Sequence, residues 1–200
     1  GALSGIPILI FSILAFWFWK KNKWIPIISV LTLFGMGFQA WLGKTVVDSN
    51  LAPYKITIHM VMALLIVAFI LYLIFASKTT YKPQKYQKRF YNILLLALVL
   101  SLVQIILGTQ VRQFIDEQTK LLGYEKTLWL ASPELNFYIH RSTSILVLVL
   151  NGYLWHLNRS NSLGFNKIKL VIYCVILEAA TGILMYYFDF PFLSQPLHLV

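Results

Sequence analysis

The chain has few of the residues on which most soluble enzymes build their active sites. Its one cysteine, Cys174, excludes a disulfide framework or a cysteine-based metal site within these 200 residues. Only seven residues are acidic, and six of them lie between the long apolar stretches. No phosphate-binding glycine loop, zinc motif or hydrolase triad can be recognised. These absences argue against the common nucleotide-binding, zinc-dependent and hydrolytic classes.

Apolar residues, by contrast, are abundant. They make up 58% of the chain, far more than in an ordinary soluble domain. Crossing the hydrocarbon layer of a membrane takes about 20 apolar residues in a helix. We expect six such helices and the start of a seventh at Pro196, the six lying at 2–19, 24–43, 55–76, 90–111, 136–157 and 168–187. Because backbone groups in lipid must be satisfied internally, these runs predict an all-α, polytopic membrane helical bundle.

The net charge of +10 follows the same pattern of helices. Eleven of the 17 basic residues lie in alternate links, which contain no acid and cover residues 20–24, 77–89 and 158–169. Such alternation is what the positive-inside rule predicts, so we expect these three links to be cytoplasmic. The excess charge is then a topology signal with some affinity for anionic membrane lipid. We expect no nucleic-acid partner.

A pattern of glycine and histidine recurs three times. In each case a helix ends on a polar residue followed four positions later by glycine, and the next helix begins with a histidine. The three instances are Gln39 and Gly43 before His59, Gln104 and Gly108 before His140, and Glu178 and Gly182 before His198. The glycine and the histidine are 16 residues apart in the first and third cases and 32 in the second. Three of only four histidines therefore share one position, which suggests a repeated metal or heme site.

The expected topology places His59, His140 and His198 at the outer ends of three parallel helices, at similar depth. Two such helices can present an imidazole to each face of a flat macrocycle. Two axial histidines are typical of a six-coordinate, electron-transferring b-type heme. The alternative for any one interfacial histidine is a boundary or hydrogen-bonding residue. The fourth, His156, is expected to mark the inner interface.

Each neighbouring residue also has a structural alternative. Arg141 is a candidate contact for an anionic heme propionate, or an interfacial anchor. The three glycines either accommodate a cofactor or allow close helix packing. Gln39 and Gln104 either donate to a buried ligand or link helices. Glu178, the one acid inside an apolar span, is either a polar structural contact or a proton relay.

These motifs, taken in order, resemble the heme A synthase family. Residues 39–47 with Pro53 and His59-Met60 are similar to its third and fourth helices. Residues 104–111 and 137–141 are similar to its fifth and sixth helices, and Thr181-Gly182 with residues 196–199 to its seventh and the start of its eighth. The resemblance covers nearly the whole chain. It implies eight helices in two similar four-helix halves, each with a heme site.

The resemblance also implies roles for individual residues. Residues 1–76 would be the remainder of the N-terminal half, 77–89 a basic cytoplasmic linker, and 90–200 the C-terminal half. His140 and His198 would ligate the iron of heme b, with Arg141 as a further cofactor contact. His59 would be an axial ligand to the iron of the substrate heme in the N-terminal half.

Both ends of the chain are expected to be incomplete. Residue 1 is not Met, no signal peptide is present, and the last helix begins only at Pro196. The second ligand of the N-terminal site and the family's catalytic acid would then lie before Gly1, and the fragment itself is expected to be inactive. At the equivalent offset in the C-terminal half stands Phe137, which fits a half that carries electrons.

The reaction implied by the resemblance oxidises the ring methyl of heme O to the formyl group of heme A, with heme b as electron-transfer cofactor. The expected place is the inner membrane of a bacterium. Heme O synthase and terminal oxidase subunits are candidate partners, while the electron donor stays open. The alternatives are a non-catalytic bis-histidine b-type cytochrome that takes electrons from a quinone, and a cofactor-free structural or transport bundle.

Overall fold

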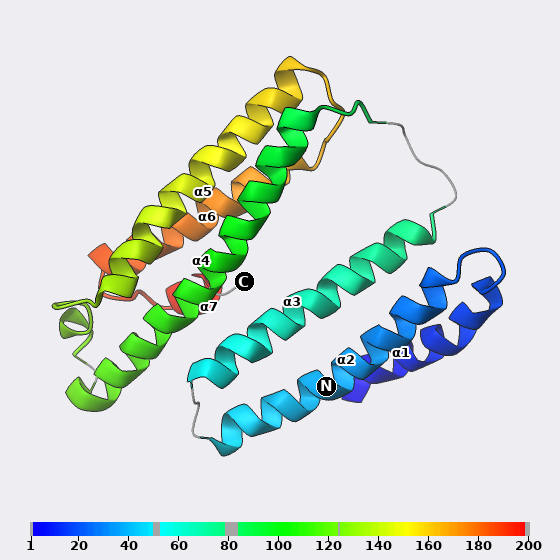
Figure 1. Cartoon of the computed structure of the whole chain (residues 1–200). Helices are drawn as coiled ribbons and strands as arrows, with labels where there is room; N and C mark the ends of the chain where they lie inside the picture. Colours follow the sequence, from blue (N-terminus) through cyan, green and yellow to red (C-terminus); the bar gives the residue numbers. More distant parts are fainter. Residues whose placement is uncertain (1, 50–52, 79–83, 124, 199–200) are drawn as a thin grey trace. The chain divides into compact units, whose positions relative to one another are not determined.

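The computed structural model describes residues 2–49, 53–78, 84–123 and 125–198, and all regular structure within these ranges is helical (Figure 1). The elements are α1 (Ala2–Ala15), η1 (Phe16–Phe18), α2 (Trp24–Asp48), α3 (Pro53–Ala76), α4 (Lys88–Leu122), η2 (Lys126–Leu128), α5 (Leu135–Ser160), α6 (Ile168–Tyr187) and α7 (Ser194–His198). The prediction of an all-α polytopic membrane bundle is confirmed.

Four of the described helices are long and apolar enough to cross a membrane, namely α2, residues 54–76 of α3, α4 and α6. The sequence predicted six membrane-spanning helices, and by the length and hydropathy of the described helices this number was too high. Helix α1 is apolar but short. Helix α5 has the length but includes Arg141, Asn151 and Arg159 among its polar residues, which lower its hydropathy.

The chain forms two compact units, Gly1–Lys82 and Pro83–Val200, which we call the N-terminal and C-terminal units. In the N-terminal unit α2 packs against both α1 and α3. The Ser12 hydroxyl of α1 donates to the carbonyl oxygen of Ser29 in α2 at 3.0 Å, and both side chains are buried. Because both side chains are buried, this bond is an effective link between the two helices.

In the C-terminal unit α5 packs against α4 and α6, and α7 packs against α6. One apolar cluster lies where α5 turns into α6 and is made of Phe90, Ala97, Leu154, Leu157, Leu163 and Ile168. A second cluster, of Ile115, Trp129 and Phe190, lies where the chain passes from α6 towards α7. The two clusters thus hold α4 and α6 near both of their ends, and α5, which carries His140, packs between these two helices.

Several predicted boundaries were wrong, because the helices extend beyond their apolar spans. Helix α2 continues to Asp48, α5 to Ser160, and α4 runs from Lys88 to Leu122. Asp116 and Glu117 therefore lie in a helix and not in a link. In this polar end of α4, Arg112 lies 3.7 Å from Asp116, and the Gln113 amide donates to Glu117 at 2.7 Å. Such pairs four residues apart stabilise a helix in water.

The single cysteine, Cys174, has an exposed side chain on α6. A helix that spans a membrane turns apolar side chains outward to lipid, so a small apolar residue has no need of the core. Lys82 and Pro83 of the predicted basic linker, and Leu199 and Val200 at the end, lie outside the described residues.

Candidate functional site

Each repeated glycine contacts the histidine of the element that follows it. The three pairs are Gly43 with His59, Gly108 with His140, and Gly182 with His198. A Cβ atom placed on Gly43 would lie 3.3 Å from the imidazole Cε1, and one on either of the other two glycines 3.2 Å. These distances are tighter than most real Cβ contacts, so a side chain at any of these positions would require the imidazole to shift by a few tenths of an ångström. The glycines are therefore the positions that let each imidazole lie against a neighbouring helix.

The polar residue four positions before each glycine reaches the same histidine. The Gln39 amide donates to the carbonyl oxygen of His59 at 3.1 Å, and the Gln104 amide donates to that of His140 at 2.8 Å. Both glutamines thus form interhelical hydrogen bonds. In the third repeat this position is an acid, Glu178, whose carboxylate lies beside the imidazole ring of His198.

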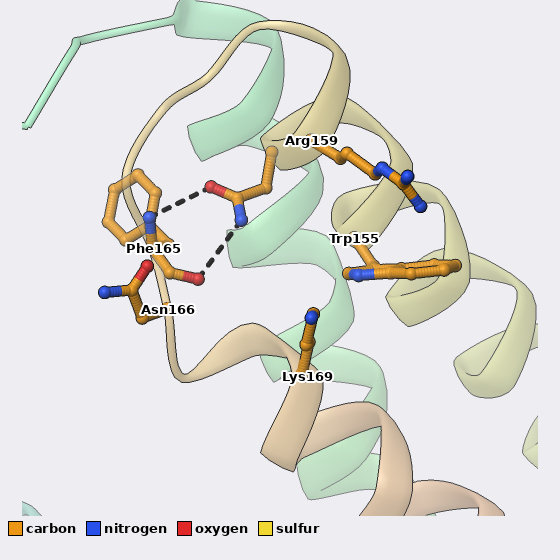
Figure 2. A pocket seen from close by; sticks show the side chains of 6 residues that line it. Trp155, Arg159, Phe165, Asn166 and Lys169 are labelled. Atoms are coloured by element: carbon orange, nitrogen blue, oxygen red, sulfur yellow. Dashed lines mark hydrogen bonds between the residues drawn. The ribbon is translucent and has the colours of Figure 1, made fainter.

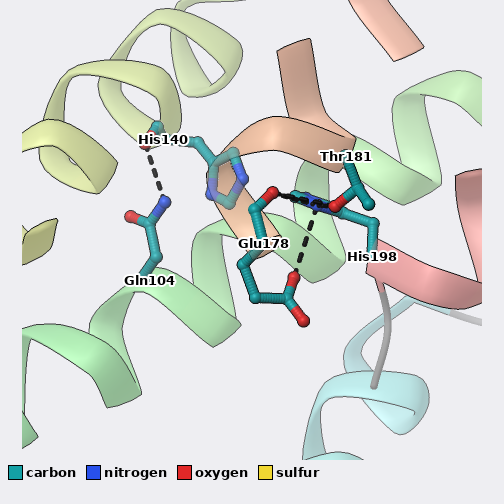
Figure 3. Close-up of polar contacts among 5 residues, drawn as sticks. All are labelled: Gln104, His140, Glu178, Thr181 and His198. Carbon is teal, nitrogen blue, oxygen red and sulfur yellow. Dashed lines mark hydrogen bonds and ion pairs between the residues drawn. The ribbon is translucent and has the colours of Figure 1, made fainter. Parts of the chain in front are cut away.

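The C-terminal unit brings two histidines together (Figure 3). The ring centroids of His140 and His198 are 6.2 Å apart, and the ring planes are at 83° to each other. Gln104, whose amide holds the backbone of His140, accepts a hydrogen bond at 2.5 Å from the hydroxyl of Thr143. This second bond fixes the glutamine side chain and with it the part of α5 around His140 and Thr143.

His198 makes its contacts through Nδ1. This nitrogen lies 3.0 Å from the Glu178 carbonyl oxygen, 3.0 Å from the Thr181 hydroxyl and 3.4 Å from a carboxylate oxygen of Glu178. A carbonyl can only accept, so the proton of the neutral ring belongs on Nδ1. Nε2 then keeps its lone pair, as in metal-binding histidines whose other nitrogen donates to a carbonyl or carboxylate.

The turn before α7 sets the position of His198. Asp189, Phe190 and Leu193 all have positive φ angles, between 53° and 67°, a backbone conformation that costs free energy for residues other than glycine. The ammonium group of Lys126 donates to the carbonyl oxygen of Phe190 at 2.9 Å, and the Trp129 ring packs on the Phe190 ring at 5.3 Å. These contacts hold the reversal that returns the chain to α6.

The residues of the C-terminal unit fit a heme. Metal–imidazole bonds are about 2 Å long, so two rings ligating one metal from opposite sides have centroids about 6 Å apart. The observed 6.2 Å between His140 and His198 matches this separation. Nδ1 of His140 is buried without a hydrogen-bond partner, as is Nδ1 of His59, so no contact of Nδ1 fixes the tautomer of the His140 ring. In the described residues no three His, Cys, Asp or Glu side chains could hold a metal ion, whereas a heme needs only two axial ligands.

His59 in the N-terminal unit has a different environment. The Gln39 amide nitrogen lies 3.2 Å from His59 Nε2, as well as bonding the backbone of the same residue. An amide nitrogen can only donate, so Nε2 accepts and the proton belongs on Nδ1. That Nδ1 is buried without a partner. His59 therefore becomes a metal ligand through Nε2 only if the Gln39 side chain turns away.

Arg141 and His156 complete the set of predicted residues. The guanidinium carbon of Arg141 lies 5.4 Å from the centre of the Tyr186 ring, which itself stacks on Phe137. His156 is exposed and stacks on Tyr153, at the other end of α5 from His140. The Thr181 hydroxyl is a further partner of His198, which the sequence pattern did not predict. Its place directly before Gly182 in the motif was the available signal.

Comparison with known proteins adds one finding. The family model COX15-CtaA, described as cytochrome oxidase assembly protein, matches residues 1–200. The match includes both units and all three glycine–histidine pairs. No curated protein and no solved structure matches the chain.

Proposed function

Because this chain belongs to the heme A synthase family of cytochrome oxidase assembly proteins, we propose that it takes part in oxidising the ring methyl of heme O to the formyl group of heme A. The product would serve a terminal oxidase. The observation that carries the proposal is the pair of facing imidazoles in the C-terminal unit, each seated against a glycine.

In this proposal the C-terminal half, residues 90–200, lies within the C-terminal unit and carries the electrons. His140 and His198 are the axial ligands of heme b, and Gly108 and Gly182 leave the space in which the imidazoles sit. When bound, heme b supplies one-electron transfer. The protein's own part is to hold His198 in one tautomer through Glu178 and the backbone of α5 in place through Gln104.

Arg141 is proposed as the contact for an anionic heme substituent. Its guanidinium rests over the Tyr186 ring, an arrangement that orients the group without using its N–H donors. An arginine held in this way can bind a carboxylate through two parallel hydrogen bonds. Because Arg141 directly follows His140 in the sequence, its guanidinium group lies at the same end of α5 as this proposed iron ligand.

The N-terminal unit is proposed to bind the substrate, heme O, with His59 as one ligand. At the offset where the family resemblance implies a catalytic acid, the C-terminal unit has Phe137, whose ring packs on Tyr186. An aromatic ring in this contact cannot transfer a proton. This difference supports electron transfer in the C-terminal half and oxidation of the substrate in the N-terminal half.

The test is heme extraction with pyridine hemochrome spectroscopy on the full-length protein, comparing wild type with His59→Ala and His140→Ala. We expect heme b together with heme O or heme A in the wild type. His59→Ala should lose chiefly heme O and heme A, and His140→Ala chiefly heme b. His156→Ala is the matched control, because this histidine is exposed and lies away from the paired rings.

A second candidate function is a non-catalytic b-type cytochrome. The contact between the Gln39 amide and His59 Nε2 favours it, because an imidazole capped in this way does not ligate iron. A single-heme carrier needs only His140 and His198. Heme b alone, unaffected by His59→Ala, would support this candidate and would contradict the synthase proposal. Absence of heme from the wild type would contradict both.

A further inference from the structure

A hollow lies at the connection between α5 and α6, at the end of the C-terminal unit away from the paired histidines. Its volume is about 510 Å³, and it is lined by Trp155, Asn158, Arg159, Phe165, Asn166 and Lys169 (Figure 2). Trp155 and Arg159 come from the last turns of α5, Lys169 from the first turn of α6, and Phe165 and Asn166 from the loop between them.

The loop that closes the hollow is firmly held. The Asn158 side chain accepts a hydrogen bond from the backbone N–H of Phe165 at 3.0 Å and donates one to its carbonyl oxygen at 3.1 Å, as Figure 2 shows. The Phe165 ring stacks on Phe90 of α4 at 4.8 Å, beside the buried Leu163. The wall of the hollow is therefore positioned by packing from three helices.

The charge around the hollow is of one sign. Residues 135–177, which include α5, the loop and the first half of α6, contain no Asp or Glu. The ion pairs found among the described residues involve neither Arg159 nor Lys169. The neighbouring end of α4 adds only basic groups, Lys88 and Arg89, and Arg89 packs over the ring of Tyr153. The two lining cations thus lack a carboxylate partner.

The start of α6 indicates that the hollow lies near the level of a membrane surface. Helix α6, which is apolar enough to cross a membrane, begins at Ile168, within the rim of the hollow. Directly beyond it, Leu170 and Tyr173 are exposed and suited to contact lipid chains. Tryptophan prefers the headgroup level, and Trp155 lines the hollow. Basic pockets between membrane helices are typical binding places for anionic lipid headgroups.

We propose that this hollow binds a phosphate group, carried by the headgroup of an anionic phospholipid. Arg159 and Lys169 supply the charge-assisted hydrogen bonds, and the indole N–H of Trp155 and the amide of Asn166 are further donors. The site stands independently of the proposed reaction, because it shares no residue with the paired histidines.

The test uses the full-length protein in nanodiscs of phosphatidylcholine containing a minor fraction of phosphatidylglycerol. Native mass spectrometry then counts the phosphatidylglycerol retained after transfer to detergent. Loss of one charge-assisted hydrogen bond should weaken retention about tenfold in either Arg159→Gln or Lys169→Gln. Lys167→Gln is the matched control, since it removes one charge from the same loop but does not line the hollow. It should retain the lipid as the wild type does.

A second arm adds inorganic phosphate to lipid-depleted protein and follows the melting temperature. Phosphate stabilisation that both lining substitutions abolish, without any preference for phosphatidylglycerol, would overturn the lipid assignment in favour of a soluble phosphate. Equal retention in all three variants, or equal loss in all three, would overturn the site itself. Arg159 and Lys169 are both exposed, so neither substitution removes a buried contact, and unchanged helical circular dichroism would verify folding.

Discussion

The two units of this protein carry the same glycine–histidine contact but use it differently. The C-terminal unit has it twice, and the two imidazoles face each other at 6.2 Å. In the N-terminal unit it occurs once, and a glutamine amide covers the ring nitrogen that a metal would use. The contact by itself therefore places an imidazole against a helix, and a second copy beside the first is what brings two imidazoles together.

The three repeats also differ at the position four residues before the glycine. The amides of Gln39 and Gln104 bond backbone carbonyls, whereas the Glu178 carboxylate lies beside the ring of His198. A carboxylate beside a ligating imidazole increases the electron donation of that ring, while an amide on the backbone only holds the helix. Under the proposed function, the third repeat is the one in which a carboxylate would act on a ligating imidazole.

The largest expected effect separates the two units directly. His198→Ala removes one of the two facing imidazoles, so the heme b content of the purified full-length protein should fall to background. His59→Ala should leave heme b unchanged, because this histidine lies in the other unit. Pyridine hemochrome spectra measure both. Equal loss of heme b in the two variants would contradict the assignment of heme b to the C-terminal unit.

Filling the glycine positions should give the next largest effect. A side chain at Gly108 or Gly182 starts 3.2 Å from the imidazole and must push it aside, so we expect Gly108→Val and Gly182→Val to weaken heme b binding about tenfold or more. Heme titration followed by absorbance measures the affinity. Gly37→Val is the control, since a Cβ there meets nothing within 4 Å. A comparable loss in the control would refute a specific role for the glycine–histidine contact.

Removing the glutamine of the second repeat should affect stability more than chemistry. Gln104→Leu leaves the His140 carbonyl and the Thr143 hydroxyl without this partner, so the free energy of unfolding should decrease by about 1–3 kcal/mol. Gln113→Leu, which breaks an exposed bond within α4, should cost no more than about 0.5 kcal/mol. Denaturation in detergent, followed by circular dichroism, compares the two. Equal costs would show that the interhelical bond has no special role.

The smallest effect concerns the acid of the third repeat. Glu178→Gln makes this position the same as in the other repeats and removes a negative charge 3.4 Å from His198 Nδ1. Loss of that charge disfavours the oxidised metal, so the midpoint potential of heme b should rise by on the order of 50 mV. A shift of this size changes the equilibrium ratio of reduced to oxidised heme roughly tenfold. Spectroscopic redox titration measures it. An unchanged or lower midpoint potential would show that Glu178 is only a structural contact.

The helical class and the repeated glycine–histidine contact could be predicted from the sequence because the relevant signals are local. Apolar runs of membrane length indicated the helical class, and the spacing of Gly43, Gly108 and Gly182 from their histidines indicated a repeated site. The resemblance to the heme A synthase family is confirmed by the family match over the whole chain. The predicted ends of α4 were wrong because hydropathy follows the membrane, whereas helical hydrogen bonds and charge pairs continue into water.

By itself, the sequence determined that this protein is a helical membrane protein and which imidazoles are candidate ligands, because composition and spacing act along the chain. Only the tertiary structure decided that His140 and His198 face each other, that Gln39 covers His59, and that Cys174 points outward. These depend on how one helix rotates and slides against another. That geometry arises from side chains far apart in sequence, such as Phe90 against Phe165 and Trp129 against Phe190, and no local pattern specifies it.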